Sequence, residues 1–165
     1  MTIALNLIVG PYEVFIDKED YELISQYRWF PQKGNNTVYL IAHSKGIPSK
    51  ERKTIRMHRL IMNAQPWQKI DHVNGNGLDN RKENLRFATS QQNSQNLRRF
   101  EGVSKYKGVV YDTNPKQKNK WRARITVDKN RIHLGRFPSE REAAFAYNEA
   151  AIKYFGGFAR LNEVA

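Results

Sequence analysis

The chain has 165 residues, no cysteine and a formal charge of +12 at neutral pH, with 28 lysines and arginines against 16 aspartates and glutamates. Because it has no cysteine, the chain can form no disulfide, thiolate zinc site or thiol nucleophile, so any metal must be bound by nitrogen or oxygen ligands. No apolar run approaches the roughly 20 residues that span a bilayer, and the N-terminus lacks a signal-peptide pattern, so we expect a soluble cytoplasmic protein with no membrane partner.

The basic charge is spread along the whole chain. Residues 1–100 hold 15 basic and 9 acidic side chains, and residues 101–165 hold 13 and 7, so each part contributes +6. With 39% hydrophobic and 12% aromatic residues, the chain is too apolar for a disordered basic tail. We therefore expect a folded protein that binds a polyanion, with nucleic acid as the first partner to consider. A basic protein of unrelated function stays an alternative.

The first part of the chain is predicted to contain short strands and helices. Alternating apolar residues predict two strands over 3–9 and 13–16, followed by a short helix that the acidic run 17–20 caps. Strands over 38–42 and 53–57 form a predicted hairpin around a polar loop, 44–52 in the sequence. A helical pattern follows over 58–62 and is predicted to end at Pro66 and Trp67. We expect all three tryptophans in the core: Trp29, Trp67 and Trp121.

One segment in the middle of the chain holds the residues with the clearest chemistry. Asp71 and His72 precede a turn rich in glycine and asparagine, and a short strand follows over 84–88. Ser90 can then cap a helix that carries Asn93 in its first turn. The turn residues suit positive backbone dihedrals and need no chemical role: Asn74, Asn76, Asp79 and Asn80.

A strand, a loop, a second strand and a helix can bring Asp71, His72 and Asn93 together. The Asp71 carboxylate and the Asn93 amide oxygen are hard ligands that suit Mg²⁺, and a neutral His72 can accept a proton near pH 7. Phosphodiester hydrolysis needs such a base to activate water and a cation to stabilise the phosphate. The alternative is that His72 and Asp71 form only a surface pair.

These residues resemble the HNH endonucleases with the ββα-metal fold, notably the homing-type branch found in phage and group I introns. The resemblance covers about residues 38–96 and includes the His58-Arg59-Leu60 lead-in and the Asn84-Leu85-Arg86 signature. The cysteine pairs that brace many HNH proteins are absent, so the small fold must rely on its apolar core and on packing from residues 1–37.

The resemblance implies a role for each matching residue. It implies His72 as the general base, Asn84 as the residue that braces the His72 loop, and Asp71 and Asn93 as ligands of one Mg²⁺ or Mn²⁺ ion. It also implies products with 5′-phosphate and 3′-hydroxyl ends. The expected location of the protein is the cytoplasm of a bacterial or phage-infected cell. One site per chain predicts that a monomer nicks one strand and requires no protein partner.

Several cations of the first part are candidate phosphate contacts. Arg59, Arg81 and Arg86 are predicted to bind DNA, although solvated charge is an equal alternative for Arg81 and Arg86. His58 heads an apolar helix and is expected to be structural or a phosphate contact rather than a catalyst.

The second part predicts a three-stranded antiparallel meander covered by one helix. Strands are predicted over 108–112, 121–127 and 131–137, with a turn at 128–130 between the last two. Ser139 and Glu142 match a capping box that opens a helix through Tyr154, and Gly156-Gly157 closes it.

One face of this predicted sheet is basic. Alternation places Trp121, Ala123, Ile125 and Val127 on one face and Arg122, Arg124 and Thr126 on the other. Residues 105–136 hold ten lysines and arginines and two acids, whereas residues 137–165 hold three and four. A ribbon bearing arginines is narrow enough for a DNA major groove, where arginine donates two hydrogen bonds to guanine. The alternative is a solvated polar face.

The same region resembles the Apetala-two/ethylene-response-factor DNA-binding domain over about 60 residues. The motifs that carry the resemblance run in order along the chain: 104–109 (SKYKGV), 120–125 (KWRARI), 134–137 (LGRF), 142–151 (EAAFAYNEAA) and 159–162 (ARLN). The resemblance marks five residues as DNA contacts: Lys107, Lys120, Arg124, Arg131 and His133. Arg122 is a further predicted contact because it lies on the basic face. Plant members usually have arginine at three positions that differ here, Val110, Asp112 and Thr126, and the loop 113–119 is longer. Plant target preferences therefore do not transfer.

A short basic linker near residue 101 separates the two predicted domains, 1–100 and 101–165. The predicted fold is α+β: an N-terminal HNH ββα-metal nuclease domain, then a three-stranded antiparallel sheet packed on one helix. The predicted function is metal-dependent DNA cleavage by the first domain, positioned in the major groove by the second. The main alternative is a non-catalytic, sequence-specific DNA-binding regulator with a degenerate HNH scaffold. A third alternative, an RNA-binding protein or ribonuclease, has less support, since an A-form major groove does not admit this sheet.

Overall fold

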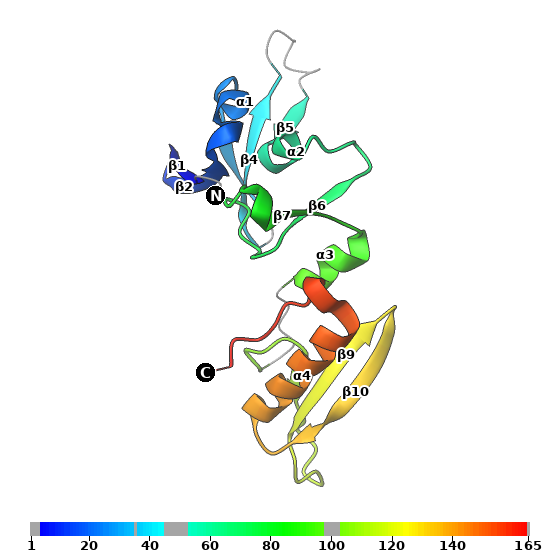
Figure 1. Cartoon of the computed structure of the whole chain (residues 1–165). Coiled ribbons are helices and arrows are strands. Elements are labelled where there is room, and N and C mark those ends of the chain that lie inside the picture. The colour runs from blue at the N-terminus through cyan, green and yellow to red at the C-terminus, as the bar shows by residue number, and fades with distance from the viewer. Residues whose placement is uncertain (1–3, 35, 45–52, 98–102, 165) are drawn as a thin grey trace. The chain divides into compact units, whose positions relative to one another are not determined.

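The computed structural model describes residues 4–34, 36–44, 53–97 and 103–164. The chain divides into two compact units, Met1–Asn93 and Ser94–Ala165 (Figure 1). The domain boundary predicted near residue 101 and most of the predicted loop 44–52 lie outside the described residues. No helix in the described ranges is both long and apolar enough to span a membrane.

The first unit begins with a hairpin and a helix, as predicted. Strands β1 (Ala4–Val9) and β2 (Tyr12–Asp17) pair antiparallel, and Gly10 turns between them at φ +60°. A 3₁₀ turn (Lys18–Asp20) and helix α1 (Tyr21–Ser25) follow. The acidic run precedes α1 as predicted, but neither Asp17, the N-cap of the 3₁₀ turn, nor Asp20, the N-cap of α1, makes a side-chain cap hydrogen bond. Asp17 Oδ2 instead accepts a hydrogen bond from the Lys82 backbone N at 2.8 Å.

A three-stranded antiparallel sheet forms the centre of the first unit. Its order is β3 (Phe30–Lys33), β4 (Val38–His43) and β5 (Thr54–Arg56), so the predicted hairpin of the last two is confirmed. Helix α2 (Met57–Ile61) follows and ends before Asn63, which has φ +45°. Pro66 and Trp67 therefore do not end it, and Trp67 is 77% exposed, so its predicted place in the core is wrong.

The segment that follows forms a ββα unit. Strands β6 (Lys69–His72) and β7 (Leu85–Ala88) pair antiparallel, a 3₁₀ turn (Lys82–Asn84) precedes β7, and helix α3 (Ser90–Asn96) follows it. Thr89 caps α3: the Gln92 backbone N donates to Thr89 Oγ1 at 3.1 Å, and the Thr89 backbone N donates to Gln92 Oε1 at 2.8 Å. The predicted Ser90 cap is therefore wrong by one residue.

One apolar core holds these elements together. It draws on β2, α1, β4, α2 and β7, so it joins strands and helices that are distant in the sequence. Its buried members are Val14, Ile16, Ile24, Leu40, Met57, Ile61 and Leu85.

The second unit is the predicted meander packed on one helix. Strands β8 (Val109–Tyr111), β9 (Trp121–Val127) and β10 (Asn130–Phe137) pair antiparallel in the order β10-β9-β8. Helix α4 (Glu140–Phe155) lies across one face of this sheet (Figure 1). Its predicted capping box is confirmed, because the Glu142 backbone N donates to Ser139 Oγ at 3.2 Å and Ser139 Oγ donates to Glu142 Oε1 at 2.9 Å. The predicted α+β fold class is confirmed.

Small residues let α4 approach the sheet closely. Ala143, Ala144 and Ala151 are fully buried in the interface, and Ala123 of β9 faces them. Gly108 has φ +74°, and a Cβ there would lie 2.1 Å from the ring of Tyr147. Glycine is therefore required before β8 for the backbone to pass this ring.

A bulge in β10 changes which side chains share the outer face of the sheet. His133 pairs with Arg124 and Gly135 pairs with Ala123, so Leu134 is one extra residue in β10. Beyond the bulge Arg136 pairs with Arg122. A strict alternation from Ile132 through Leu134 would instead place Arg136 on the helix side.

Candidate active site and basic sheet face

His72 lies at the end of β6, in contact with two other rings. It is 6% exposed, and its ring packs edge-on against His58 of α2, with centroids 5.1 Å apart. Tyr39 of β4 closes the group, at 5.9 Å from His72 and 5.6 Å from His58. Two elements, β4 and α2, thus pack on the imidazole that β6 carries.

Burial keeps both histidines neutral at physiological pH. It lowers the pKa of His72 below its usual value, and this exceeds the opposing influence of Asn80, Asp71 and Asp79. Burial, with the neighbouring His72 and Arg56, lowers the pKa of His58 to about 3. A neutral imidazole has a lone pair that can accept a proton.

Asp71 lies next to His72 in sequence but on the opposite face of the β6–β7 ribbon, because side chains alternate along a strand. Its cross-strand neighbour is Arg86, whose Nε and Nη2 donate to Asp71 Oδ2 at 2.9 and 2.6 Å. The Asp71 carboxylate is nearly buried, with 5% of the side chain exposed, and the guanidinium compensates its charge.

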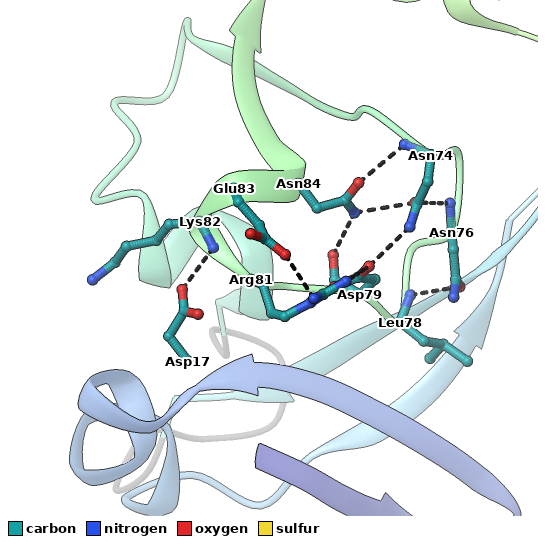
Figure 2. A network of polar contacts seen from close by, with 9 residues as sticks. All are labelled: Asp17, Asn74, Asn76, Leu78, Asp79, Arg81, Lys82, Glu83 and Asn84. Carbon is teal, nitrogen blue, oxygen red and sulfur yellow. Dashed lines mark hydrogen bonds and ion pairs between the residues drawn. The ribbon is translucent and has the colours of Figure 1, made fainter. Parts of the chain in front are cut away.

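The loop after His72 is held by side-chain amides, as Figure 2 shows. The Asn84 Oδ1 accepts from the Asn74 backbone N at 3.0 Å, and Asn84 Nδ2 donates to Asn74 Oδ1 at 3.1 Å and to the Asp79 carbonyl at 2.8 Å. Asn74 Nδ2 in turn donates to Asp79 Oδ2 at 2.8 Å. Asn84 therefore closes the loop between β6 and β7 from its C-terminal end.

The expected backbone of this loop differs from the observed one. Only Gly75 has a positive φ, +75°, whereas the asparagine and aspartate residues act through their side chains. Asn76 is an example, because its Oδ1 accepts from the Leu78 backbone N at 3.1 Å. The polar side chains of this loop hydrogen-bond to nearby backbone groups and so take the place of backbone–backbone turn hydrogen bonds.

The N-terminal hairpin also fixes this loop. The Phe15 backbone N donates to the Leu78 carbonyl at 3.0 Å, and the Asn80 backbone N donates to the Phe15 carbonyl at 2.7 Å. The Lys82 backbone N donates to Asp17 Oδ2 at 2.8 Å (Figure 2). Residues before position 37 thus brace the loop.

Asn93 lies in α3 and is half-buried. Its backbone N donates to the Thr89 carbonyl at 3.0 Å, and among the described residues its side chain makes no hydrogen bond to Asp71 or His72. Lys69 Nζ donates to Ser90 Oγ at 2.7 Å, which ties the first turn of α3 to β6. Within the described ranges, no group of three or more histidine, aspartate or glutamate side chains has the geometry of a metal site.

The three arginines predicted as DNA contacts in this unit are bonded to protein groups. Arg59 donates to the carbonyls of Gln68 and Gln65 at 2.6 and 2.7 Å and so fixes the loop after α2. Arg81 pairs with Asp79 at 2.8 Å and with Glu83 at 2.6 Å, which raises the pKa of Arg81 (Figure 2). Arg86 pairs with Asp71, as described. The sequence analysis did not predict that these arginines bind protein groups, although Asp79 and Glu83, two residues to either side of Arg81, indicate ion pairs for it.

The predicted DNA contacts of the second unit occupy different environments. Lys107 Nζ donates to the Gln95 carbonyl and Lys120 Nζ to the Asn114 carbonyl, so both ammonium groups are bonded to backbone. On the outer face of the sheet, Arg131 and His133 are exposed, whereas Arg122 and Arg124 are half-buried. Burial and the charge of Arg131 lower the pKa of Arg124.

Comparisons with known proteins identify two kinds of relative. The sequence model of the HNH endonuclease family matches residues 56–95. An uncharacterized HNH endonuclease of Acanthamoeba polyphaga mimivirus is 29% identical over 156 residues, which cover 91% of this chain and 74% of the viral protein. No solved structure matches the chain.

Plant transcription factors match a shorter stretch. An AP2/ERF and B3 domain-containing protein of Oryza sativa is 44% identical over 59 residues, 36% of this chain and 15% of the plant protein. An AP2-like ethylene-responsive transcription factor of Arabidopsis thaliana is 34% identical over 115 residues, 64% of this chain and 20% of that protein. The chain thus spans a fifth or less of the length of these two proteins. It combines a segment that matches the HNH endonuclease family with partial similarity to AP2/ERF transcription factors, and both resemblances predicted from the sequence are confirmed.

Proposed function

We propose that the chain is a metal-dependent DNA endonuclease of the homing type, in which the first domain cuts and the sheet of the second positions it in the major groove. The observation that supports this most is the buried, neutral His72 at the end of β6, next to Asp71 and followed by a loop that Asn84 closes. The match of residues 56–95 to HNH endonucleases covers all three residues.

In this proposal His72 is the general base. Because burial lowers its pKa, the imidazole is unprotonated at neutral pH and can take a proton from the attacking water. The rings of Tyr39 and His58 fix its orientation from the core side. Asn84 positions the loop that follows the base and does not itself react.

The proposed metal ligands are Asp71 and Asn93. Their carboxylate and amide oxygens are the hard donors that Mg²⁺ or Mn²⁺ prefers, so the donor set fits one divalent ion. The contact from Lys69 to Ser90 places the first turn of α3 near the ribbon face that also carries Asp71. The ion, when bound, stabilises the charge that develops on the phosphate. Arg86 orients the Asp71 carboxylate in this arrangement.

The outer face of the second sheet is the proposed positioning surface. We assign the contacts to Lys107, Lys120, Arg122, Arg124, Arg131 and His133, which the resemblance marks or which share the basic face. Contacts of lysine and arginine with phosphate supply most of the affinity and make it salt-dependent. In this proposal Arg59 fixes the loop after α2, and Arg81 and Arg86 hold the carboxylates of Asp79 and Asp71.

One observation favours a second candidate, a DNA-binding regulator that does not cut. Asp71 Oδ2 already accepts two hydrogen bonds from Arg86, so a guanidinium compensates the negative charge of this carboxylate without a metal ion. The regulator binds DNA without magnesium and breaks no strand.

The test is nicking of supercoiled plasmid and genomic fragments by the full chain and by His72→Ala, with Mg²⁺ or EDTA. The endonuclease proposal expects Mg²⁺-dependent nicks that His72→Ala abolishes, while the variant still shifts duplex DNA on a gel. Binding without scission, on DNA diverse enough to contain a site, would establish the regulator instead. Equal cutting by the variant would show that another residue is the base.

A further inference from the structure

We propose that Asp112 is a positioning residue that holds Arg122 and Arg136 as a fixed pair on the outer face of the β8–β10 sheet. By holding them, Asp112 limits sequence-independent contact of this face with DNA phosphates and leaves base-edge contacts available. The inference rests on the proposed DNA-binding role of the sheet.

The bulge in β10 creates the pair. Because Leu134 is the extra residue, Arg136 lies directly opposite Arg122 in the register of β10 and β9. Side chains of directly opposite strand residues are close neighbours on one face, and two like charges in this arrangement repel each other. The pair therefore needs an anion to be stable on the sheet.

Asp112 supplies that anion from the end of β8. Its backbone N donates to the Lys120 carbonyl at 2.7 Å, which continues the β8–β9 pairing by one residue. Its Oδ2 accepts a hydrogen bond from Arg136 Nη1 and lies 3.7 Å from Arg122 Nε. Its Oδ1 accepts from the Asn114 backbone N at 3.0 Å, so the loop after β8 fixes the carboxylate.

One carboxylate thus offsets part of the charge of the pair within the protein. The Asp112 side chain is only 13% exposed, and Arg136 and Arg122 are 30% and 37% exposed. A phosphate that approaches these arginines meets the nearby carboxylate and is repelled by it. A guanidinium has five N–H donors, and those not used by Asp112 remain able to donate to a neutral base edge.

The opposite end of the same face differs. Arg131 is exposed and forms no ion pair with an acidic side chain within the described part of the chain. Burial and, second to it, the charge of Arg131 lower the pKa of the neighbouring Arg124. One end of the face therefore offers charge to phosphates, and at the other end Asp112 offsets part of the charge.

Asp112→Asn tests the inference with little change in shape, because the amide oxygen can still accept from the Asn114 backbone N. The measurement is the affinity of the full chain for a mixed-sequence DNA duplex over a series of salt concentrations, without divalent ions. We expect Asp112→Asn to bind about tenfold more tightly. The slope of log affinity against log salt should steepen by about one, since each added phosphate contact displaces roughly 0.9 counterion.

Two further variants separate positioning from net charge. Glu149→Gln makes the same charge change at an exposed position of α4, away from the outer face, and should change affinity less than about twofold. In the Arg136→Gln background, Asp112→Asn should bring a clearly smaller gain, because one of the two arginines that it releases is absent. Thermal unfolding of each variant verifies that the fold is kept.

The outcomes distinguish failure of the inference from failure of the proposed function. If Arg131→Gln weakens binding but Asp112→Asn binds like the native chain, the inference is overturned and the sheet remains the DNA surface. A gain from Glu149→Gln equal to that from Asp112→Asn would also overturn it, because net charge alone would suffice. If neither Arg131→Gln nor Arg124→Gln weakens binding, the positioning role of the sheet fails, and the inference with it.

Discussion

The loop after His72 and the outer face of the β8–β10 sheet use charged side chains in opposite ways. In the loop Arg81 is bonded to Asp79, beside it Arg86 of β7 is bonded to Asp71 of β6, and the amide of Asn84 joins both ends of the loop. On the sheet face, Arg131 is exposed without an acidic partner in the described ranges, and Asp112 offsets part of the charge of one pair of cations. The first arrangement fixes geometry, as a reacting group requires, and the second provides charge, as binding a polyanion requires.

The largest expected effect comes from the base. His72→Ala should lower Mg²⁺-dependent cleavage by about 10²–10⁴-fold, because general-base catalysis contributes that much. The measurement is the single-turnover nicking rate at saturating enzyme, with the duplex affinity measured separately. His43→Ala is the matched control, because His43 is exposed on β4 and has no assigned role. Equal losses in both variants would contradict the assignment of the base.

The loop should be sensitive to loss of its buried amide. Asn84→Ala removes three hydrogen bonds and leaves polar backbone atoms unsatisfied, so the free energy of unfolding should fall by about 2–4 kcal/mol. Chemical denaturation of the full chain measures it. Asn76→Ala removes one exposed hydrogen bond of the same loop, the one that Asn76 Oδ1 accepts from the Leu78 backbone N, and should cost less than about 1 kcal/mol. Similar costs for the two variants would mean that Asn84 is not the brace.

The buried histidines should make the first unit sensitive to acid. The pKa of His58 is about 3 in the folded chain against 6.5 when unfolded, so the unfolded state binds more protons between these values. Stability is therefore full above pH 6.5 and falls as the pH decreases toward 3. One such proton contributes a slope of about 1.4 kcal/mol per pH unit.

Replacing His58 should reduce that slope. His58→Phe keeps a ring beside His72 and should lower the pH dependence of the unfolding free energy between about pH 6 and 4 by nearly one proton. Denaturation at several pH values measures this slope, and His43→Phe should leave it unchanged. An unaltered slope in His58→Phe would show that His58 is solvated in the folded chain.

The smallest expected effect distinguishes an exposed arginine from a bonded one. Arg131→Gln should weaken duplex binding a few-fold and reduce the salt slope by about one, since it removes one phosphate contact. Arg59→Gln should leave that slope unchanged and instead lower the unfolding free energy by about 1–3 kcal/mol, because its carbonyl contacts are lost. A reduced slope in Arg59→Gln would restore the phosphate contact predicted from the sequence.

Local patterns were sufficient to predict much of the fold. The capping box at Ser139 and Glu142, the turn before β10 and the ββα order around Asp71 and His72 depend on neighbours within a few residues, and all are present. The cap of α3 was placed one residue late, because Thr89 and Ser90 carry the same hydroxyl and only the backbone distinguishes them.

Tertiary structure decided the surroundings of each site. The sequence by itself determined the α+β class, the basic sheet face and the residues that carry chemistry, because these follow from composition and periodicity. The sequence alone could not reveal that Tyr39 and His58 pack on His72, that Arg86 donates hydrogen bonds to Asp71, or that Trp67 is exposed. The bulge at Leu134 was equally hidden, because an extra residue is visible only when two strands are paired. These contacts join segments far apart in the chain, and local periodicity carries no information about such pairings.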